Sequence, residues 1–385
     1  GKKLSANDTA TSAGEFVLTA DQLIANKTDS ASISQNTQYL QSLVDTASNS
    51  GGGIVHIPAG TYYFGESSQS SSEAFVILCK NNVTIEGENS ATVLKPYGQT
   101  QSGLTMFYFN EYGDSNGRNA TYLENADFRS FTIDGSDTSC NTYTTAGKGF
   151  KLNLLRNCDW ENVMVMYTDA TGFGIECPIN CTVVNCAAIG CGKAATETQQ
   201  GASGFGIGMG YSIDESICIE NSTATDNKRY GFAFVHQGKY DPDLYSAQSA
   251  RGFVVRNCEA NRNRYDIGGE KANDVIYENC TSIGDTSFIH FEETSTRVKL
   301  IGCHVETTLE DVTDSSEYYY TPVYWSLDNG ISDGVTLTRF GVDTDAPRGQ
   351  VITLLWRMAG RPGVHFLDSH GQIFDDVPVD SEYAA

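Results

Sequence analysis

Four segments of the chain repeat a glycine–aromatic phrase, and the polar positions of these segments could carry acid–base chemistry on a bound ligand. The segments are GKGFKLNLL, TGFGIEC, SGFGIGMG and YGFAFVHQ. Because successive side chains of a strand point to opposite faces, the apolar positions are expected to face inward: Phe150, Leu152, Phe173, Ile175, Phe205, Ile207, Phe232 and Phe234. The outward positions then form a stripe of small residues flanked by charged ones: Lys151, Asn153, Gly174, Glu176, Gly206, Gly208, Ala233, Val235, Asp266, Gly268, Glu270, His290 and Glu292.

We expect this stripe to be the floor of a groove on which a sugar ring can approach the backbone. The alternative is that the glycines only relieve crowding at a bend of the chain. If neighbouring coils stack ~4.8 Å apart, Glu270 and Glu292 face each other at about the separation of the carboxylates in a retaining glycosidase. Asp266 is expected to stack near His290. The predicted catalytic residues are Asp266, Glu270, Glu292 and Glu176, because a desolvated carboxyl can act as general acid while its partner stays ionised.

Two long inserts are expected to border the groove, at residues 193–203 and 236–250, since loops of this length are usually functional or disordered. Tyr240 and Tyr245 of the second insert, together with Tyr211, could stack on sugar faces. His236 is either a base or a histidine satisfied at the end of its strand. The predicted substrate-binding residues are His290, Lys271, Arg264, Lys151, His236, Tyr240, Asp241 and Tyr211.

The charge of the chain excludes some partners. Its 385 residues include 25 Lys and Arg against 48 Asp and Glu, a formal charge of −23. A field of this sign repels nucleic acids and anionic lipid surfaces. No apolar run approaches the ~18 residues of a membrane span, and the polar start GKKLSANDTATSAG has no signal-peptide core. We expect no membrane insertion, and the missing signal peptide does not argue against a secreted protein.

The cysteines reveal an internal repeat. Most of the eleven follow a short strand in phrases such as RNC, VNC, ENC and IGC, and the steps from Cys158 to Cys181, Cys258 to Cys280 and Cys280 to Cys303 are 23, 22 and 23 residues. Such a period with a strand in each unit is typical of a β-solenoid. The sequence therefore predicts an all-β fold, a right-handed parallel β-helix.

Within this fold the cysteines are expected to stack as free, buried thiols, with disulfides as the alternative. The absence of a CxxC pair argues against a metal cluster, and we predict no metal site. The Asn before each Cys is expected to occupy a turn that needs φ > 0 or a ladder of side-chain amides.

The segment ISQNTQYLQSLVDTASNSGGGIVHIPAGTYYF resembles the entry cap of the pectate-lyase superfamily: a capping helix, a glycine run, then a strand from Ile54 to Phe64. The following VTIEGENSATVLKPYG resembles that superfamily's first coil. The resemblance implies a pectin-lyase-like β-helix over residues 30–306, after an N-terminal extension of residues 1–29. Families with this fold include polysaccharide lyases, uronate epimerases, glycoside hydrolases and phage tailspikes.

Motifs of these families match only in part. GFGIGMG is similar to the polygalacturonase stretch GHGISIG, but Phe205 stands at the position of the catalytic His and the paired upstream aspartates are absent. TGFGIE is similar to the alginate-epimerase phrase YGFDPH, with Thr171 and Gly174 in place of its Tyr and Asp. A β-elimination lyase would need a Lys or Arg base and a charge neutraliser, often calcium; Lys271, Arg264 and Lys239 are the candidates.

Residues 307–385 resemble one complete S-layer homology repeat and the start of a second. The resemblance rests on an Asp-Val opening, a helix with Tyr324, Trp325 and Asn329-Gly330, and a second helix with Arg348, Gln350, Leu354, Trp356 and Arg357. It implies a mostly helical module that anchors the protein to a cell-wall polymer. The alternative is a small cap over the open end of the β-helix.

Together these features predict a secreted or surface-attached bacterial protein that acts on a poly- or oligosaccharide. We expect glycoside hydrolysis by paired carboxylates, without a cofactor. The alternatives are a polysaccharide lyase, which would use calcium, and a non-catalytic glycan-binding adhesin.

Overall fold

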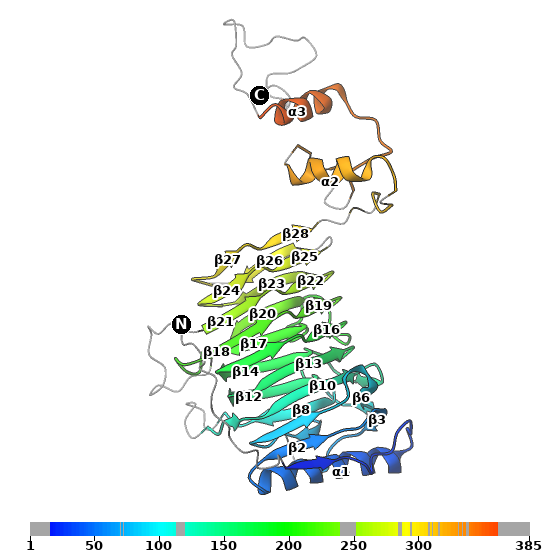
Figure 1. The fold of residues 1–385 in the computed structure, drawn as a ribbon, viewed down its shortest axis with the longest axis vertical. Coiled ribbons are helices and arrows are strands. Elements are labelled where there is room, and N and C mark those ends of the chain that lie inside the picture. Colours follow the sequence, from blue (N-terminus) through cyan, green and yellow to red (C-terminus); the bar gives the residue numbers. More distant parts are fainter. Residues whose placement is uncertain are drawn as a thin grey trace, which may run out of the picture. The chain divides into compact units, whose positions relative to one another are not determined.

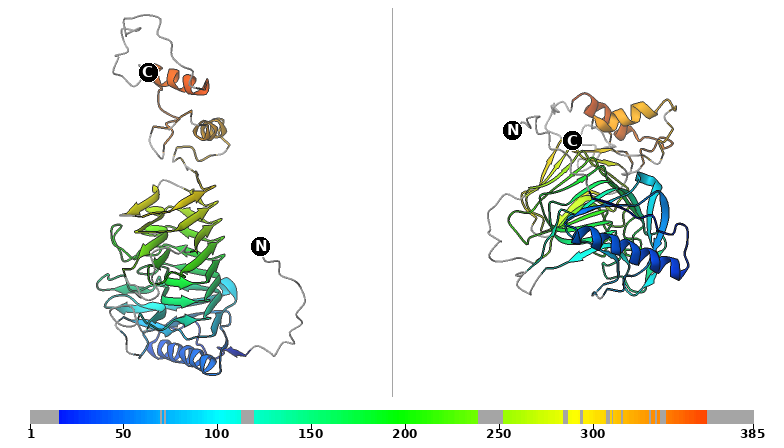
Figure 2. Two further views of the ribbon diagram at one scale, coloured as in Figure 1. Left: turned by 90° about the vertical axis from the view of Figure 1, so that its left-hand side faces the viewer. Right: turned by 60° about the horizontal axis from the view of Figure 1, so that its bottom comes forward.

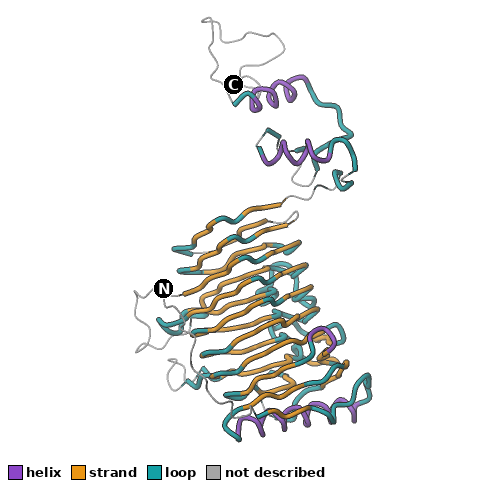
Figure 3. The backbone as a smooth tube through the Cα atoms, viewed as in Figure 1, coloured by secondary structure: helices purple, strands orange, loops and turns teal. Residues whose placement is uncertain are grey.

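The computed structural model describes residues 16–69, 71, 73–112, 120–238, 252–283, 287–292, 295–306, 309, 311–314, 316–329, 331–332, 334–335 and 339–360. The chain divides into two compact units, Gly1–Val305 and Glu306–Ala385. The first unit is a stack of β-coils and the second holds two helices (Figures 1 and 3).

The first unit begins with helix α1 (Ser30–Asn49), which lies across the N-terminal end of the coils (Figures 1 and 2). Asp29 caps the helix by accepting a hydrogen bond from the backbone N–H of Ser32 at 3.0 Å, which satisfies one of the free donors of the first turn. The buried side of α1 includes Leu40 and Val44, which join the core of the coils. The capping helix predicted from sequence is confirmed.

The segment predicted as a single strand from Ile54 to Phe64 is instead two strands, β2 (Gly53–His56) and β3 (Gly60–Phe64), so this prediction was wrong. Pro58 lies between them, and its missing N–H and fixed φ favour a turn over a continuous strand. Part of the predicted N-terminal extension also belongs to the β-helix, because Val17–Thr19 pairs in parallel with β2.

The coils build a parallel β-helix with two faces of different form. Nine strands of the described residues form sheet B: β4 (Phe75–Leu78), β8 (Thr105–Asn110), β9 (Leu123–Glu124), β12 (Phe150–Arg156), β14 (Phe173–Ile179), β17 (Phe205–Met209), β20 (Tyr230–His236), β23 (Tyr265–Glu270) and β26 (Ser287–Glu292). All their pairings are parallel, as the predicted fold class requires. The prediction of an all-β parallel β-helix is confirmed.

The second face, sheet A, has two arms that share the long strands β10 (Asp127–Asp134) and β13 (Asp159–Met166). One arm adds β1 (Val17–Thr19), β2, β5 (Val83–Glu86), β15 (Cys181–Val184), β18 (Ser216–Glu220), β21 (Gly252–Arg256), β24 (Val275–Glu278) and β27 (Lys299–Ile301). The other adds β3, β6 (Thr92–Pro96), β16 (Ala187–Ile189), β19 (Thr223–Thr225), β22 (Glu259–Asn261), β25 (Thr281–Ile283) and β28 (His304–Glu306). A 3₁₀ turn, η1 (Asn89–Ala91), precedes β6, and β7 (Gly98–Thr100) pairs with β11 (Thr138–Cys140).

Asparagines turn the chain at the corners of the coils. Their φ values are positive, for example 53° at Asn157 and Asn180 and 51° at Asn279, and Asn tolerates this left-handed conformation better than most residues. Their side chains also form amide ladders: Asn180 donates to Asn157 at 2.7 Å and Asn279 donates to Asn257 at 3.4 Å. Both roles expected of these residues are confirmed.

The cysteines are free and mostly buried, as predicted. They form more than one stack, however, because the Asn-Cys phrase occurs at two different corners. Cys158 and Cys181 follow strands of sheet B, whereas Cys186, Cys258, Cys280 and Cys303 lie between the two arms of sheet A. In this second stack Ser222 takes the place of a cysteine, donating its N–H to Cys258 Sγ at 3.4 Å.

The second unit contains α2 (Tyr320–Asp328) and α3 (Arg348–Met358), near the two helices expected there. Leu309, Val312 and Val323 form a small apolar cluster of its own. The Asp311 carboxylate accepts hydrogen bonds from the backbone N–H groups of Phe340, Gly341 and Val342, and these bonds lower the Asp311 pKa against the opposing effect of burial. Residues 361–385, which include the expected second repeat, lie outside the described residues.

Thiol titration is expected to find nearly all eleven cysteines free in the unfolded protein under non-reducing conditions. In the native protein, the part-exposed Cys140, Cys218 and Cys303 should react first. The buried thiols should react slowly, because burial raises the pKa of Cys191 to about 11 and that of Cys280 to about 12, and the thiolate is the reactive form. Recovery of four or five disulfides would contradict the stacked-thiol core.

Candidate functional site

The outer face of sheet B carries the predicted stripe in the predicted register. Phe150, Phe173, Phe205, Phe232, Ile267 and Ile289 follow one another across the paired strands. All of these are buried except Ile289 in the last coil, which is 44% exposed. Two residues further along, Leu152, Ile175, Ile207 and Phe234 are buried as well. The outward row between them contains Gly174, Gly206, Ala233, Gly268 and His290, and the next contains Glu176, Gly208, Val235, Glu270 and Glu292.

A pocket of about 300 Å³ opens over this face. Strands β14, β17, β20 and β23 supply its floor, and the loop of residues 193–203 supplies part of its wall. Its lining residues are Thr145, Lys148, Thr171, Glu176, Gln200, Gly201, Ser203, Gly206, Ile207, Gly208, Arg229, Tyr230, Ala233, Val235, His236, Gln237 and Glu270. The lining is mostly polar and offers both donors and acceptors of hydrogen bonds.

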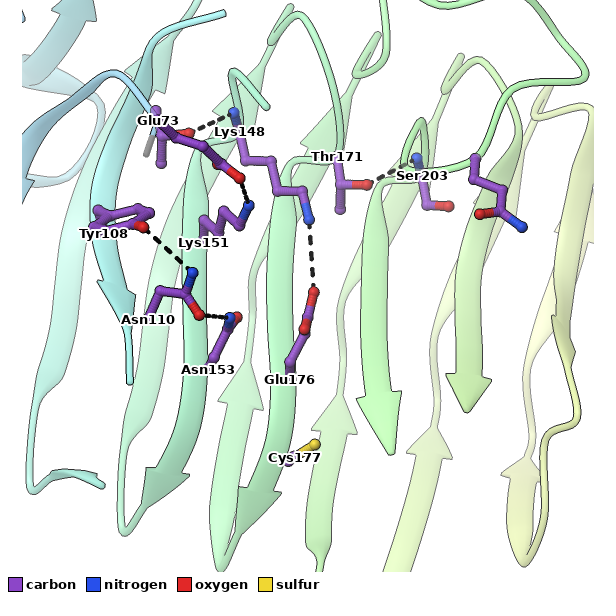
Figure 4. Close-up of polar contacts among 12 residues, drawn as sticks. Glu73, Tyr108, Asn110, Lys148, Lys151, Asn153, Thr171, Glu176, Cys177 and Ser203 are labelled. Atoms are coloured by element: carbon purple, nitrogen blue, oxygen red, sulfur yellow. Dashed lines mark hydrogen bonds and ion pairs between the residues drawn. The ribbon is translucent and has the colours of Figure 1, made fainter. Parts of the chain in front are cut away.

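At one end of the pocket Lys148 faces Glu176 (Figure 4). Lys148 Nζ lies 3.8 Å from Glu176 Oε1, and the hydroxyl of Tyr112 donates to Glu176 Oε2 at 2.5 Å. Burial lowers the pKa of Lys148 below its ordinary value, although the charge of Glu176 opposes this shift. Burial and the neighbouring Glu176 both raise the pKa of Tyr112, so its hydroxyl keeps its proton and acts as a donor.

At the other end Glu270 lines the pocket, and its paired residue on β26, Glu292, lies next to the lining residues rather than among them. Gln200 donates to Glu270 Oε2 at 3.1 Å. Glu292 Oε1 receives three contacts: Arg229 at 2.7 Å, His290 Nε2 at 3.0 Å and the Tyr230 hydroxyl at 3.4 Å. Partial burial opposes ionisation of Glu292, but the hydrogen bond with His290 and the charge of Arg229 outweigh it and lower the Glu292 pKa.

Aromatic rings stand beside this carboxylate pair. The Tyr265 and His290 rings are stacked, with centroids 3.9 Å apart, and Tyr230 lies 5.3 Å from Tyr265. The Arg229 guanidinium covers the Tyr230 ring at 5.0 Å. The ring faces are thus covered by His290 and Arg229, and the stack holds these two side chains beside Glu292.

The loop of residues 193–203 is held against the groove by contacts from distant coils. Tyr143 donates to the backbone oxygen of Gln200 at 2.6 Å, and Arg264 donates to the backbone oxygen of Glu197. Lys193 Nζ binds Asp169 at 2.5 Å and the Gly135 carbonyl at 2.9 Å. The expectation that this insert borders the groove is confirmed. In the second insert, residues 239–250 lie outside the described residues.

The glycines of the stripe make room for neighbouring atoms. A Cβ at Gly174 would lie 2.8 Å from Lys148 Cδ, and one at Gly208 would lie 2.8 Å from Glu176 Cγ. At Gly268 the neighbour is the backbone oxygen of His290, at 2.0 Å. The small residues therefore serve the placement of Lys148 and Glu176 as well as the flat floor that the sequence suggested.

Asp266 does not face the groove, so its predicted orientation was wrong. It is fully buried, accepts a hydrogen bond from Asn263 Nδ2 at 2.9 Å and contacts the Ser282 hydroxyl. It occupies the position of Gly149, Gly172, Gly204 and Gly231 in the neighbouring coils, one residue before the aligned Phe or Ile. The chain bends there, so the alternation that starts at Ile267 does not extend back to Asp266. The residue paired with His290 is Gly268.

Other predicted binding residues are also held elsewhere. Tyr211 is 1% exposed in a cluster with Leu154 and Cys177, so it is not an exposed stacking platform. Lys151 faces outward but forms an ion pair with Glu73, and Lys271 and Arg264 are not among the pocket-lining residues. The predicted Tyr240 and Asp241 lie outside the described residues.

His236 does line the pocket, at the C-terminal end of β20. Its Nδ1 accepts a hydrogen bond from the backbone N–H of Gly238 at 3.0 Å, as for a histidine that ends its strand. Gly210 must be glycine beside it, because a Cβ there would lie 2.4 Å from His236 Nε2.

Sequence reasoning missed Lys148, Arg229, Gln200 and Tyr112. The signal for Lys148 was present: it lies two residues before the aligned Phe150, in the same column as Thr171, Ser203 and Tyr230, all of which line the pocket. Tyr112 and Gln200 carry no such signal, because they reach the site from segments outside the aligned strands.

Among the described residues, no group of three or more His, Cys, Asp or Glu side chains is placed to hold a metal ion. No helix there is long and apolar enough to cross a membrane.

Comparisons with known proteins give similarity of fold only. No family model and no curated protein matches this chain. Similar solved structures include the A-module of mannuronan C-5 epimerase AlgE4 from Azotobacter vinelandii, with 16% identity over 74% of this chain and 95% of that one and a TM-score of 0.45. The tailspike protein of E. coli bacteriophage HK620 shows 15% identity over 76% of this chain and a TM-score of 0.48; this chain covers 51% of it, about half its length. At these identities and scores we draw no functional conclusion.

We expect Asp266→Asn to melt at or above the wild-type temperature at neutral pH. Burial raises the Asp266 pKa above its ordinary 3.8, so the native state binds a proton that the unfolded chain has already lost. The stability that this group contributes therefore falls as the pH rises from its pKa in the unfolded chain to its higher pKa in the folded chain. Asn does not titrate and avoids this loss. Asp266→Ala should cost about 1–3 kcal/mol, because Asn263 and Ser282 lose their buried partner. Circular dichroism melts from acid to neutral pH measure both effects; an Asn variant that is less stable at every pH would contradict this account.

Proposed function

We propose that the protein hydrolyses glycosidic bonds of a poly- or oligosaccharide bound in the groove of sheet B. One observation carries the proposal: Glu270 and Glu292 face each other in register, and each carboxylate has one anchored oxygen. The other oxygens, Glu270 Oε1 and Glu292 Oε2, have no hydrogen-bond partner within the part of the chain that the structure describes.

The two carboxylates have different partners. His290 and Arg229 stabilise the negative charge of Glu292 against its partial burial, so we assign it the role of nucleophile. Glu270 lines the pocket and accepts a hydrogen bond from the neutral amide of Gln200, so we assign it the role of proton donor. The backbone spacing of adjacent parallel strands, ~4.8 Å, is close to the ~5–5.5 Å carboxylate separation of retaining enzymes.

The reaction then follows in two steps. Glu270 protonates the glycosidic oxygen while Glu292 attacks the anomeric carbon, which breaks the bond to the leaving sugar and forms a glycosyl ester. Glu270, now ionised, removes a proton from water, and that water attacks the anomeric carbon and releases Glu292. Tyr230 and Arg229 line the pocket beside the proposed position of the reacting sugar.

The other two proposals from the sequence have less support. Of the bases considered for β-elimination, Arg264 is engaged with the Glu197 carbonyl and the Tyr265 ring, and Lys271 does not line the pocket. A non-catalytic glycan-binding protein would have no need of a paired, asymmetric set of carboxylates. Product analysis separates the three, since a lyase leaves an unsaturated sugar and a binding protein leaves the glycan intact.

Glu270→Gln and Glu292→Gln are each expected to lower turnover ~100- to 10,000-fold while the fold is kept, because they remove the proton donor and the nucleophile. Turnover is measured by product analysis on glycans first identified by array binding, and the fold by circular dichroism. Glu278→Gln is the control: this residue pairs with Arg256 on sheet A, away from the pocket, and its loss should leave turnover unchanged. Full turnover by both groove variants would refute the assignment of this pair.

We further propose that the protein works outside the cell or on a bacterial surface, with the second unit as an S-layer-homology-like anchor to a cell-wall polymer. The second unit has its own apolar cluster of Leu309, Val312 and Val323, which supports a separate module with its own role.

Deletion of residues 306–385 is expected to leave the β-rich circular dichroism spectrum and glycan binding unchanged. The reason is that the core of the β-helix is built from residues of the first unit. Cell-wall pull-down should be lost with the deletion if the unit is an anchor. Loss of solubility and of the β-signal would instead indicate that the unit caps the β-helix.

A further inference from the structure

Lys148 is a buried cation whose side chain makes no hydrogen bond to any residue that the structure describes. The residue is only 7% exposed, and it lines the pocket. Within the described residues its only close charged partner is Glu176 Oε1 at 3.8 Å, which is beyond hydrogen-bond distance. An ammonium group has three donors, and burying them without acceptors is costly unless a ligand supplies the acceptors.

Glu176 is fixed in place by a different residue. Tyr112 donates to its Oε2, so this carboxylate does not need Lys148 to hold its position. Its Oε1 has no hydrogen bond among the described residues and is the oxygen that faces Lys148. The pair therefore presents a donor and an acceptor side by side, each with free capacity, at one wall of the pocket.

The chemistry of this pair selects for hydroxyl groups. A hydroxyl both donates and accepts, so two neighbouring hydroxyls can accept from Lys148 and donate to Glu176 at the same time. A carboxylate or sulfate bound to Lys148 would lie within a few ångströms of the Glu176 charge and be repelled. The net charge of −23 for the chain acts in the same direction on an anionic polymer.

We propose that Lys148 and Glu176 form a subsite that binds two adjacent hydroxyls of a neutral sugar, some distance from the bond that is cleaved. The proposal rests on the proposed function for the position of the reacting sugar. Glu176 and Glu270 lie in the same row on strands three steps apart, about 14 Å at the backbone. Only an extended oligosaccharide bridges this separation, so the substrate class is a neutral glycan chain rather than a short or acidic sugar.

The test measures binding of neutral, carboxylated and sulfated oligosaccharides of several lengths to an array, using the full chain carrying Glu270→Gln so that no glycan is consumed. Lys148→Met in this background should weaken the binding of long neutral oligosaccharides ~10-fold or more, because they lose a hydrogen bond to a charged group. Disaccharide binding should be unchanged, because a disaccharide does not reach the subsite. Glu176→Gln, which keeps an acceptor, should have a smaller effect. Lys95→Met is the control, since Lys95 is a mostly buried lysine bound to Asp134 and Asp137 on sheet A.

Three results would overturn the subsite. These are unchanged binding of long neutral glycans by the Lys148→Met variant, loss of binding confined to acidic glycans, and no glycan bound by any form of the protein. Melting curves of each variant separate lost contacts from lost folding, and Lys148→Gln serves if the Met variant does not fold. Failure of the proposed function is a different result: Glu270→Gln and Glu292→Gln then keep turnover, whereas long neutral glycans still depend on Lys148.

Discussion

The stacking of aromatic rings inside the coils is the constraint on which the groove depends. Phe107, Phe150, Phe173, Phe205 and Phe232 follow one another with centroids 5.4, 5.3, 4.5 and 4.9 Å apart. A slip of one residue in any strand would turn its ring outward and expose a large apolar surface. The same rings therefore fix which side chains reach solvent on the opposite face. In this way the interior of the β-helix determines that Glu270 faces Glu292 and that Gly206 and Gly208 line the pocket floor.

The corners add a second, polar constraint. Positive φ values turn the chain at two kinds of corner, for example at Asn157 and Asn180 after strands of sheet B and at Asn257 and Asn279 between the arms of sheet A. Their amide ladders and the buried thiols that follow them pair polar groups that would otherwise be unsatisfied at each corner. Because each coil repeats the same turn, the strands of sheet B remain in register over the whole groove, and long loops can leave the coils without disturbing it.

Sequence periodicity could predict what each coil repeats and not what differs between coils. The inward phenylalanines, the outward glutamates and the asparagine turns recur at a fixed period, so alternation placed them correctly. Asp266 was misplaced because it stands where Gly149, Gly172, Gly204 and Gly231 stand in the preceding coils, directly before the aligned inward residue, and both it and Ile267 are buried. Lys148 was visible in its column, but Tyr112 and Gln200 were not, because they come from loops whose path no local pattern determines. Contacts such as Gln200 with Glu270, 70 residues apart, exist only once the coils are stacked.

The electrostatics of the groove follow from where these long-range contacts fall. At the β23–β26 end, Arg229 and His290 bind Glu292 directly and keep it charged. At the β14 end, Tyr112 holds Glu176, and Lys148 lies 3.8 Å from this carboxylate without a hydrogen bond to any described residue. The two ends therefore contain similar residue types, a glutamate, a tyrosine and a cation, but differ in which partner holds the carboxylate. A cation that binds a carboxylate directly lowers the pKa of that carboxylate. A cation held a short distance away remains available to bind a ligand. The difference arises from Gly174, which lets the Lys148 side chain lie flat over β14, and from the loops that bring Tyr112 to one end and Gln200 to the other.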